Sequence, residues 1–462
     1  MTTSNSTSVQ RPDPQMAAEL REKRKRRIES SLARRHRKEK TFRIFGLASV
    51  IAGLLCVALL FSSILAKGLP AFWQSSLSVP VYFDPKIIDV GPQPVQAQGE
   101  SPAQYEQRFI DWQMRMGMVD WDALIVNGII AKDQSLAAHR DELSRIYTSS
   151  EAYHIRDMVF ADPTLIGKTQ EIKILADANI DVWLVGNIDR SLADEQQQLS
   201  PEVRQLADQM QANDVIERTF NLNIFSSPDS RSSPASSGLV GAFMGSLFMM
   251  LIVIIISIPI GVASAIYLEE FAPKNWLTDV IEVNINNLAA VPSIVFGLLG
   301  AAIFIGWMHM PLSAPLVGGL VLSLMTLPTV IITTRASLKA VPPSIRQAAL
   351  GLGASRLQTV FHHVLPLALP GILTGAIIGV AQALGETAPL LLIGMSAFVA
   401  SVPATPLDQS SALPVQIFLW QCNELRNFFE GRTAAAIIVL LAMMIGLNSL
   451  AIWLRKKFEV RW

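Results

Sequence analysis

The residues that could do chemistry in this 462-residue chain are polar side chains set within apolar sequence. Glu386 directly follows an apolar run and precedes Thr387, and Gln382 lies four residues before it. An ionisable group in such a run is expensive in a bilayer and by default marks a path for an ion or polar solute. An isolated carboxylate would repel an anion, so we expect Glu386 to pair with an arginine of another chain or to carry a proton.

Three further residues are candidates for the same path. Arg335 ends an apolar run, and Asn287 and Ser293 flank the start of another. Arg335 could contact an anion, or it could only anchor its helix at the membrane surface. Three apolar runs are predicted to be interrupted by proline, at Pro259, Pro292 and Pro328. Freed N–H groups at broken helix ends suit anions, although helix packing explains such prolines equally well.

Other chemistries find no support in the sequence. The two cysteines, Cys56 and Cys422, cannot form a disulfide framework, and the six histidines are not spaced as metal ligands. No G-x-x-x-x-G-K-[ST] motif occurs, so we expect the chain to bind neither ATP nor another cofactor itself. Lys and Arg equal Asp and Glu at 38 each, so no basic excess favours nucleic acid as a partner.

Six uncharged apolar runs are long enough to cross a bilayer, which takes about 20 residues. They are 44–66, 238–268, 288–308, 312–334, about 366–385 and 433–454. Charged residues make up only 16% of the chain, and six charge-free buried helices are not expected in one soluble globule. We therefore predict an all-α polytopic membrane protein with six transmembrane helices and an extracytoplasmic α+β insert.

The net charge of zero is a sum of unlike segments. The tail 1–41 is net +7, residues 71–237 are net −11 and residues 238–462 are net +2. Loops rich in Lys and Arg stay in the cytoplasm, which places the basic tail, the 335–365 loop and the C-terminus inside. Residues 269–284, with four acids against one lysine, disagree mildly with this orientation.

A first helix is predicted at 42–67 and a five-helix core at 238–462. The segment between them, residues 70–237, is long enough to form a domain. EIKILAD and NIDVWLVG predict strands, and SPEVRQLADQMQAN predicts a helix with Pro at its first position. DQSLAAHRDELSRIYTSSEAYHIRDMVF has apolar residues at helical spacing. We expect a small α+β domain with an acidic, solvated face and a Pro/Ser-rich linker at 225–238.

The most informative loop is 341–366, VPPSIRQAALGLGASRLQTVFHHVLP. Pro342 and Pro343 suit the first turn of a short helix, and Gly351 and Gly353 suit its end. SRLQTVFHH predicts a second short helix, so a helix–turn–helix joins two spans. Its small and apolar side chains would let a partner approach closely; the alternative is an amphipathic helix at the membrane interface.

This loop resembles the cytoplasmic EAA loop of ABC importer permeases, whose pattern is E-A-A, three residues, G, nine residues and I-x-L-P. The pattern stands here as Gln347-Ala348-Ala349, Gly353 and His363-Val364-Leu365-Pro366. The resemblance implies that the loop docks into a cleft of a separate ATPase and passes its closure to the spans. Because Gln347 replaces the family's acidic residue and His363 its aliphatic one, Arg346 or Arg356 could supply charge instead.

Two other segments point to a subfamily. NNLAAVPSIVFGLLG at 286–300 and ALGETAPLLLIG at 383–394 are similar to the PstA-type permeases of phosphate ABC importers. In that family an arginine commonly stands four residues before the glutamate of GETAPLL, where this chain has Gln382. The resemblance then implies that an anion path takes its positive charge from Arg335 or from a partner chain.

The resemblance implies a permease subunit of an ATP-driven phosphate importer in the bacterial inner membrane, with both termini cytoplasmic. Its partners would be a PstC-type permease, two PstB-type ATPase subunits that use ATP and Mg, and a PstS-type phosphate-binding protein. One alternative is a permease for another oxyanion or small solute. A second is a membrane sensor with a periplasmic domain, although the tails are too short for a signalling module.

Overall fold

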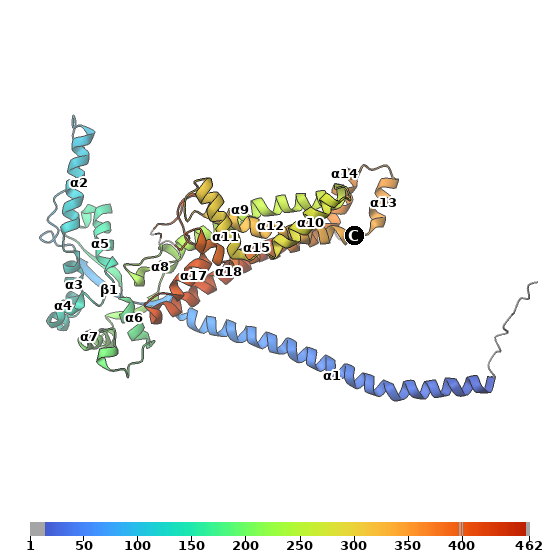
Figure 1. The fold of residues 1–462 in the computed structure, drawn as a ribbon. Helices are drawn as coiled ribbons and strands as arrows, with labels where there is room; N and C mark the ends of the chain where they lie inside the picture. The colour runs from blue at the N-terminus through green and yellow to red at the C-terminus, as the bar shows by residue number, and fades with distance from the viewer. Residues whose placement is uncertain (1–13, 397–398, 400, 459–462) are drawn as a thin grey trace, which may run out of the picture. The chain divides into compact units, whose positions relative to one another are not determined.

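The computed structural model describes residues 14–396, 399 and 401–458 and is largely helical (Figure 1). The chain divides into two units, residues 1–64 and 65–462, each of which is described by itself. The described part of the first unit is a stretch of α1 (Pro14–Gly68), a continuous helix of 55 residues. At 1.5 Å per residue α1 is about 80 Å long, so it extends well beyond its apolar run.

The second unit contains the other long apolar helices. α9 (Val240–Ile266), α12 (Pro315–Lys339), α15 (Leu365–Gly385) and α18 (Arg426–Phe458) are long and apolar enough to cross a membrane. With α1, the described residues supply five such helices, or six if one bent pair counts as a single span. The predicted helical membrane architecture with an α+β insert is confirmed.

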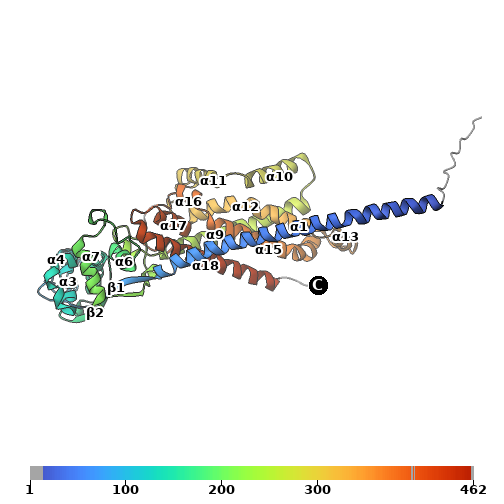
Figure 2. The same cartoon turned by 90° about the horizontal axis from the view of Figure 1, so that it is seen from below.

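The bent pair includes the third predicted span, 288–308, and its break confirms the interruption predicted at Pro292. Its first half is α10 (Trp276–Ala289). Its second half is α11 (Ser293–Gly300) with the π-helical continuation η7 (Ala301–Trp307). The axes of the two halves form an angle of 101°. Pro292 between them is extended, with ψ 136°. Proline has no N–H to donate and moves the preceding residue out of the helical region, so the helix breaks there. Figure 2 shows both halves beside α12, against which they pack.

α9 and α12 continue through Pro259 and Pro328, so the predicted interruptions at these two prolines are wrong. The two helices pack tightly along each other. A Cβ added at Gly319 of α12 would lie 2.7 Å from the Ile252 side chain of α9. Small residues let transmembrane helices approach closely.

The insert is built around an antiparallel sheet with the strand order β2–β1–β3. β1 (Trp73–Tyr82) is central and pairs with β2 (Thr169–Leu175) and β3 (Ile216–Phe220). The predicted strand EIKILAD is β2 and is confirmed. The sequence analysis did not identify β1 or β3.

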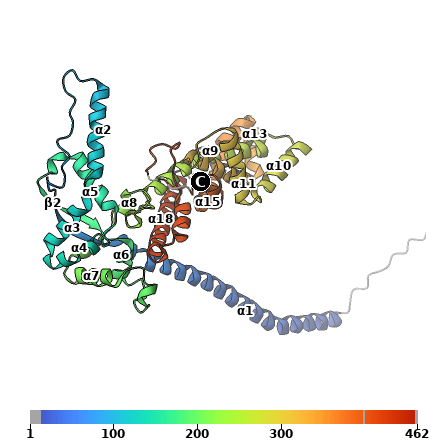
Figure 3. The same cartoon turned by 60° about the vertical axis from the view of Figure 1, so that its left-hand side comes forward.

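The insert also contains seven helices. They are α2 (Pro102–Met118), α3 (Trp121–Lys132), α4 (Arg140–Leu143), α5 (Ser150–Ala161), α6 (Ala178–Val185), α7 (Pro201–Ala212) and α8 (Asn223–Ser226). The prediction of α7 is confirmed. Figure 3 shows α2 standing out from the rest of the insert.

Two predictions within the insert are wrong. NIDVWLVG is not a strand but most of α6, which Asp177 caps at its start and left-handed Gly186 ends, with φ +81°. The long helix predicted over residues 133–160 is divided into a 3₁₀ turn, α4 and α5. The division occurs where Tyr147 leaves the helical pattern to bridge Ala176 at the end of β2.

The insert packs against the spans as well as around its own sheet. One buried cluster surrounds β1 inside the insert. A second, the core of the spans, includes Ala178 and Val182 of α6 and Ile224 of α8 together with Met249 of α9 and Phe429 of α18. The insert is therefore continuous with the span core through α6 and α8.

Candidate functional site

The 341–366 loop folds into short helices between α12 and α15, as the sequence predicts. α13 (Pro343–Gly351) is followed by α14 (Arg356–Thr359), which runs into the π-helical turn η8 (Val360–Val364). We call this end of the span bundle the loop end, and the opposite end, where the insert packs, the insert end.

Local chemistry explains the turn between the two short helices. Gly353 has φ +89°, a backbone conformation that glycine adopts without steric cost. Ser355 and Gln358 then form a reciprocal capping box that starts α14. Leu365 and Pro366, the last residues of the resembling motif, are half-buried at the start of α15.

The outer face of this loop is exposed and largely uncharged. Gln347 and Ala348 are exposed on α13, whereas Ala349 is buried. The large apolar side chains exposed beside them are Leu350, Leu352, Leu357 and Phe361, and Leu352 is 91% exposed. We call these four residues with Gln347 and Ala348 the loop surface. A cluster of exposed apolar side chains of this kind marks a contact surface for a partner or a membrane.

Arg346 ties α13 to two other helices. Its guanidinium donates to the Glu270 carboxylate at 2.6 and 3.1 Å and to the Leu338 and Val341 carbonyls at 2.9 and 2.8 Å. Glu270 lies in the π-helical turn η6 (Tyr267–Phe271), which continues α9. Arg346 is thus occupied within the chain, whereas Arg356 is exposed on the loop.

Arg335 extends the same network. It donates to Glu269 at 3.4 Å and forms an ion pair with Glu282 of α10 at 2.9 Å, and Lys339 lies 3.7 Å from Glu269. The loop-end cluster therefore consists of Glu269, Glu270, Glu282, Arg335, Lys339 and Arg346. It joins the ends of α9 and α12 and the middle of α10 to α13, and it explains why an acidic segment adjoins a basic loop.

The remaining polar candidates lie at two helix breaks. α15 ends at Gly385 and α16 (Ala388–Leu392) begins after Thr387, so Glu386 and Thr387 occupy the break. Glu386 is half-buried, and its carboxylate makes no hydrogen bond or ion pair with the residues that the structure describes. Gln382 is exposed on the last turn of α15.

The structure brings some of these residues near one another and separates others. α11, which begins at Ser293, packs against α16, and a Cβ added at Gly297 would lie 2.6 Å from the Pro389 Cα. α11 follows the break at Pro292 and α16 follows the break at Glu386, so the helices that begin at the two breaks pack against each other (Figure 2). Asn287 is exposed on α10, and Arg335 is held by carboxylates at the loop end.

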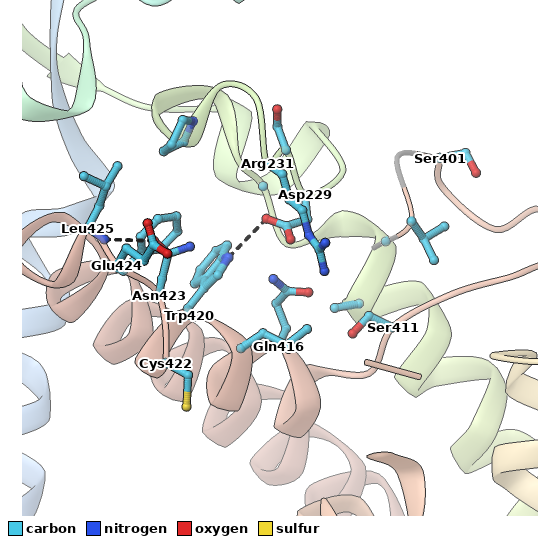
Figure 4. Close-up of a pocket in the computed structure, with 18 residues that line it drawn as sticks. Asp229, Arg231, Ser401, Ser411, Gln416, Trp420, Cys422, Asn423, Glu424 and Leu425 are labelled. Atoms are coloured by element: carbon cyan, nitrogen blue, oxygen red, sulfur yellow. Dashed lines mark hydrogen bonds between the residues drawn. The ribbon is translucent and has the colours of Figure 1, made fainter. Parts of the chain in front are cut away.

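A polar cavity of about 460 Å³ lies at the insert end, between the 229–241 segment and α17 (Leu413–Gln421). Figure 4 shows Asp229, Gln416 and Trp420 gathered around it, and the Trp420 indole N–H donates to Asp229 at 3.1 Å. Gln416 is only 2% exposed, and its Nε2 has no hydrogen-bond partner among the described residues. The sequence analysis did not identify this cavity, because its lining comes from segments about 190 residues apart.

A buried arginine joins the insert to the spans. Arg432 of α18 is 2% exposed and donates to the Ala235 carbonyl at 2.8 Å, to the Gln74 side chain at 2.7 Å and to the Ser237 carbonyl. These partners belong to the linker before α9 and to β1. In the insert, burial raises the pKa of Asp181, although the Ser75 N–H, Arg432 and Arg218 oppose that rise.

Comparison with known proteins defines the class. Residues 257–462 match the family described as "Binding-protein-dependent transport system inner membrane component", and residues 29–194 match a domain of unknown function, DUF3333. The chain is 34% identical over 182 residues to the probable ABC transporter permease protein YqgI of Bacillus subtilis (strain 168), covering 39% of this chain and 60% of YqgI. The chain is an ABC transporter permease subunit.

Two further relatives narrow the family. The chain is 33% identical over 248 residues to the phosphate transport system permease protein PstA of Yersinia pestis, covering 52% of this chain and 80% of that protein. It is 33% identical over 216 residues to PstA of Mycobacterium leprae (strain TN), covering 46% of this chain and 69% of that one. The chain belongs to the PstA-type permeases, and the predicted family is confirmed.

Proposed function

We propose that this chain forms half of the translocation path of an ATP-driven importer for inorganic phosphate. Its partners would be a PstC-type permease, two PstB-type ATPase subunits and a PstS-type binding protein. The chain itself would hold neither ATP nor Mg, which the ATPase subunits use. The observation that carries the proposal is the loop surface, which is exposed on a loop that matches the family's coupling motif in spacing.

The chain would lie in the inner membrane with both termini and the loop end in the cytoplasm. The basic N-terminal part of α1, the basic end of α18 and the loop support this orientation. The acidic segment 269–284 no longer opposes it, because three of its carboxylates pair with Arg335, Lys339 and Arg346. The insert and the polar cavity would face the periplasm.

The loop-end cluster supplies a physical route for coupling. An ATPase that closes on the loop surface would move α13, and Arg346 would carry that movement to α9 through Glu270 and to the end of α12. Arg335 would carry it to α10 through Glu282. α10 precedes the break at Pro292, so the movement would reach the half-helix α11 and, through it, the break at Glu386.

The proposal that the transported solute is phosphate rests on the PstA-type sequence around Glu386. A second candidate substrate, another oxyanion such as sulfate or molybdate, is favoured by one observation. Gln382 replaces the arginine that the family commonly has, so the charge that attracts the anion must come from elsewhere.

Uptake into vesicles tests both proposals. Proteoliposomes that contain this chain, the second permease, the ATPase and the binding protein should accumulate labelled phosphate only with ATP, and unlabelled phosphate should compete better than sulfate or molybdate. ATP-dependent uptake that persists without this chain would contradict its role in the path. Stronger competition by another oxyanion would replace phosphate as the substrate and leave the permease role intact.

A further inference from the structure

Five large apolar side chains form one exposed patch where the insert meets the spans. The patch consists of Leu69, Trp73, Phe220, Leu222 and Phe225, each between 43% and 67% exposed. The rings are in contact: Trp73 packs edge-on against Phe220 at 5.4 Å, and Phe220 stacks on Phe225 at 6.4 Å. We call these five residues the aromatic patch.

A buried ring supports this patch from beneath. Phe72, in the 3₁₀ turn η1 (Pro70–Phe72), is 8% exposed and stacks on Phe225 at 5.6 Å. Phe72 and Ile224 also belong to the core of the spans. The patch is therefore held rigidly on the spans and is not a set of mobile loop side chains.

The patch lies level with the ends of three membrane helices. Leu69 directly follows α1, and a Cβ added at Gly431 in the second turn of α18 would lie 3.3 Å from the Cβ of Ala71. Phe225 is in α8, whose Ile224 carbonyl accepts the Leu239 N–H just before α9 at 2.8 Å.

An ion pair fixes the level of the membrane surface beside the patch. Lys67 and Glu430 are 2.6 Å apart, and each side chain is more than half exposed, at 57% and 53%. An exposed ion pair is not tolerated among acyl chains, so this pair marks the headgroup region. Tryptophan, phenylalanine and leucine are the side chains that interfacial segments bury at that same level.

We propose that the aromatic patch inserts into the outer leaflet of the bilayer and rests the insert on the lipid surface. The occupant is phospholipid, because the patch adjoins the ends of the membrane helices α9 and α18, beside the exposed ion pair at headgroup level. Arg218, exposed beside it and bonded to the Pro70 and Trp73 carbonyls at 3.1 and 3.2 Å, then lies among the headgroup phosphates.

Depth-dependent quenching of a single fluorophore tests this contact. Both exposed cysteines are first replaced, as Cys56→Ser and Cys422→Ser, and an environment-sensitive bimane is attached at Leu222→Cys in the complete importer in liposomes. The matched control carries bimane at Val95→Cys, which is 80% exposed in the loop before α2. A second patch label, Phe225→Cys, repeats the measurement at an independent position.

We expect nitroxide-bearing lipids, labelled near the top of the acyl chain, to remove more than about half of the patch emission, because interfacial apolar side chains lie about 5–10 Å into the headgroup and acyl boundary. Aqueous iodide should quench only the Val95→Cys control. Iodide quenching at both patch positions would overturn the proposal by showing a water-exposed patch. If neither the nitroxide lipids nor iodide quenched bimane at either patch position, the proposal would be overturned, because another protein surface would then cover the patch. None of these readings depends on which solute is transported.

Discussion

The two ends of the span bundle hold their charges in different ways. At the loop end, three basic and three acidic side chains pair with one another and share partners, since Arg335 pairs with both Glu269 and Glu282, and Lys339 also pairs with Glu269. At the insert end, Arg432 is buried and bonded to uncharged carbonyl and amide oxygens. Ion pairs whose members have a second partner can exchange it without leaving a charge unpaired, whereas a buried arginine that loses its partners is left uncompensated at a high cost in free energy. The loop end is therefore suited to movement and the insert end to rigid attachment.

The largest expected effect is from Arg432→Met, which removes the buried attachment. The buried carbonyls of Ala235 and Ser237 would lose their donor, and the Gln74 side-chain oxygen would keep only the Asn221 amide. Breaking a buried network of this kind costs about 3–5 kcal/mol, and each kcal/mol lowers the melting temperature by about 2–4 °C. Thermal unfolding of the purified importer should show this loss.

The control for this variant is Arg426→Met, an exposed arginine in the first turn of the same helix. It should unfold at the wild-type temperature. If Arg432→Met were as stable as this control, the insert end would not depend on the buried arginine, and the contrast between the two ends would be lost.

At the loop end, the largest effect of a substitution should be on the coupling of ATP hydrolysis to uptake rather than on the stability of the fold. Ala348 is exposed on α13, so Ala348→Trp leaves the fold intact but adds bulk to the loop surface. We expect ATP hydrolysis to continue while phosphate uptake per ATP falls at least about tenfold, the cost of about 1.4 kcal/mol of misfit. Uptake and hydrolysis measured on the same proteoliposomes give the ratio.

Ala348→Ser, which barely changes the size of the side chain, should keep the wild-type ratio. A wild-type ratio in Ala348→Trp as well would mean that the loop surface does not face the ATPase. The coupling role of the loop end would then have to be assigned to other residues.

An intermediate effect is expected from the pair that joins α13 to α9. Arg346→Gln and Glu270→Gln remove the ion pair from either side, and hydrogen bonds to charged groups contribute about 1.5–3 kcal/mol. Because the two side chains act on each other, the double variant should be hardly worse than Arg346→Gln alone. Uptake per ATP is the measurement, and Arg426→Gln, at an exposed arginine of the insert end, is the control. Strictly additive losses would show that Arg346 and Glu270 act separately.

Much of the fold could be predicted from the sequence where the signal is local. Six apolar runs identified the spans, and Pro342, Gly353 and Ser355 defined the short helices of the loop, because caps and turns depend on neighbouring residues. The strand predicted at NIDVWLVG failed for a non-local reason. Its apolar residues are buried against both the sheet and the spans, and burial on two sides gives a continuous apolar run in a helix as well as in a strand.

The candidate site was predictable only in part. Glu386, Thr387 and Ser293 do lie at helix breaks, since proline and glycine mark such breaks in sequence. The pairing of Arg335 with Glu282 and of Arg346 with Glu270 was not predictable, because the partners are more than 50 residues apart. The available signal was the run of acids directly after the second span, which balances the basic loop on the same side of the membrane.

The smallest effect should come from a second buried charge at the insert end. Burial raises the pKa of Asp181 in the folded protein above the ordinary value of about 3.9. The folded state then holds the proton more readily than the unfolded state, so stability falls as the pH rises from about 4 through the raised pKa. Asp181→Asn cannot ionise, so the melting temperature of the wild type should fall relative to this variant over that window.

Asp189 provides the opposite case for the same measurement. The Ser191 hydroxyl lowers the pKa of Asp189, so its charged form is favoured in the folded state. The wild type should therefore gain stability relative to Asp189→Asn as the pH rises toward about 4, and change little above it. If the wild type instead kept a constant difference from Asp181→Asn at every pH, Asp181 would carry the same charge folded and unfolded. Arg432 would then have a buried counter-charge above about pH 4, and the two ends of the bundle would differ in exposure but not in the kind of pairing.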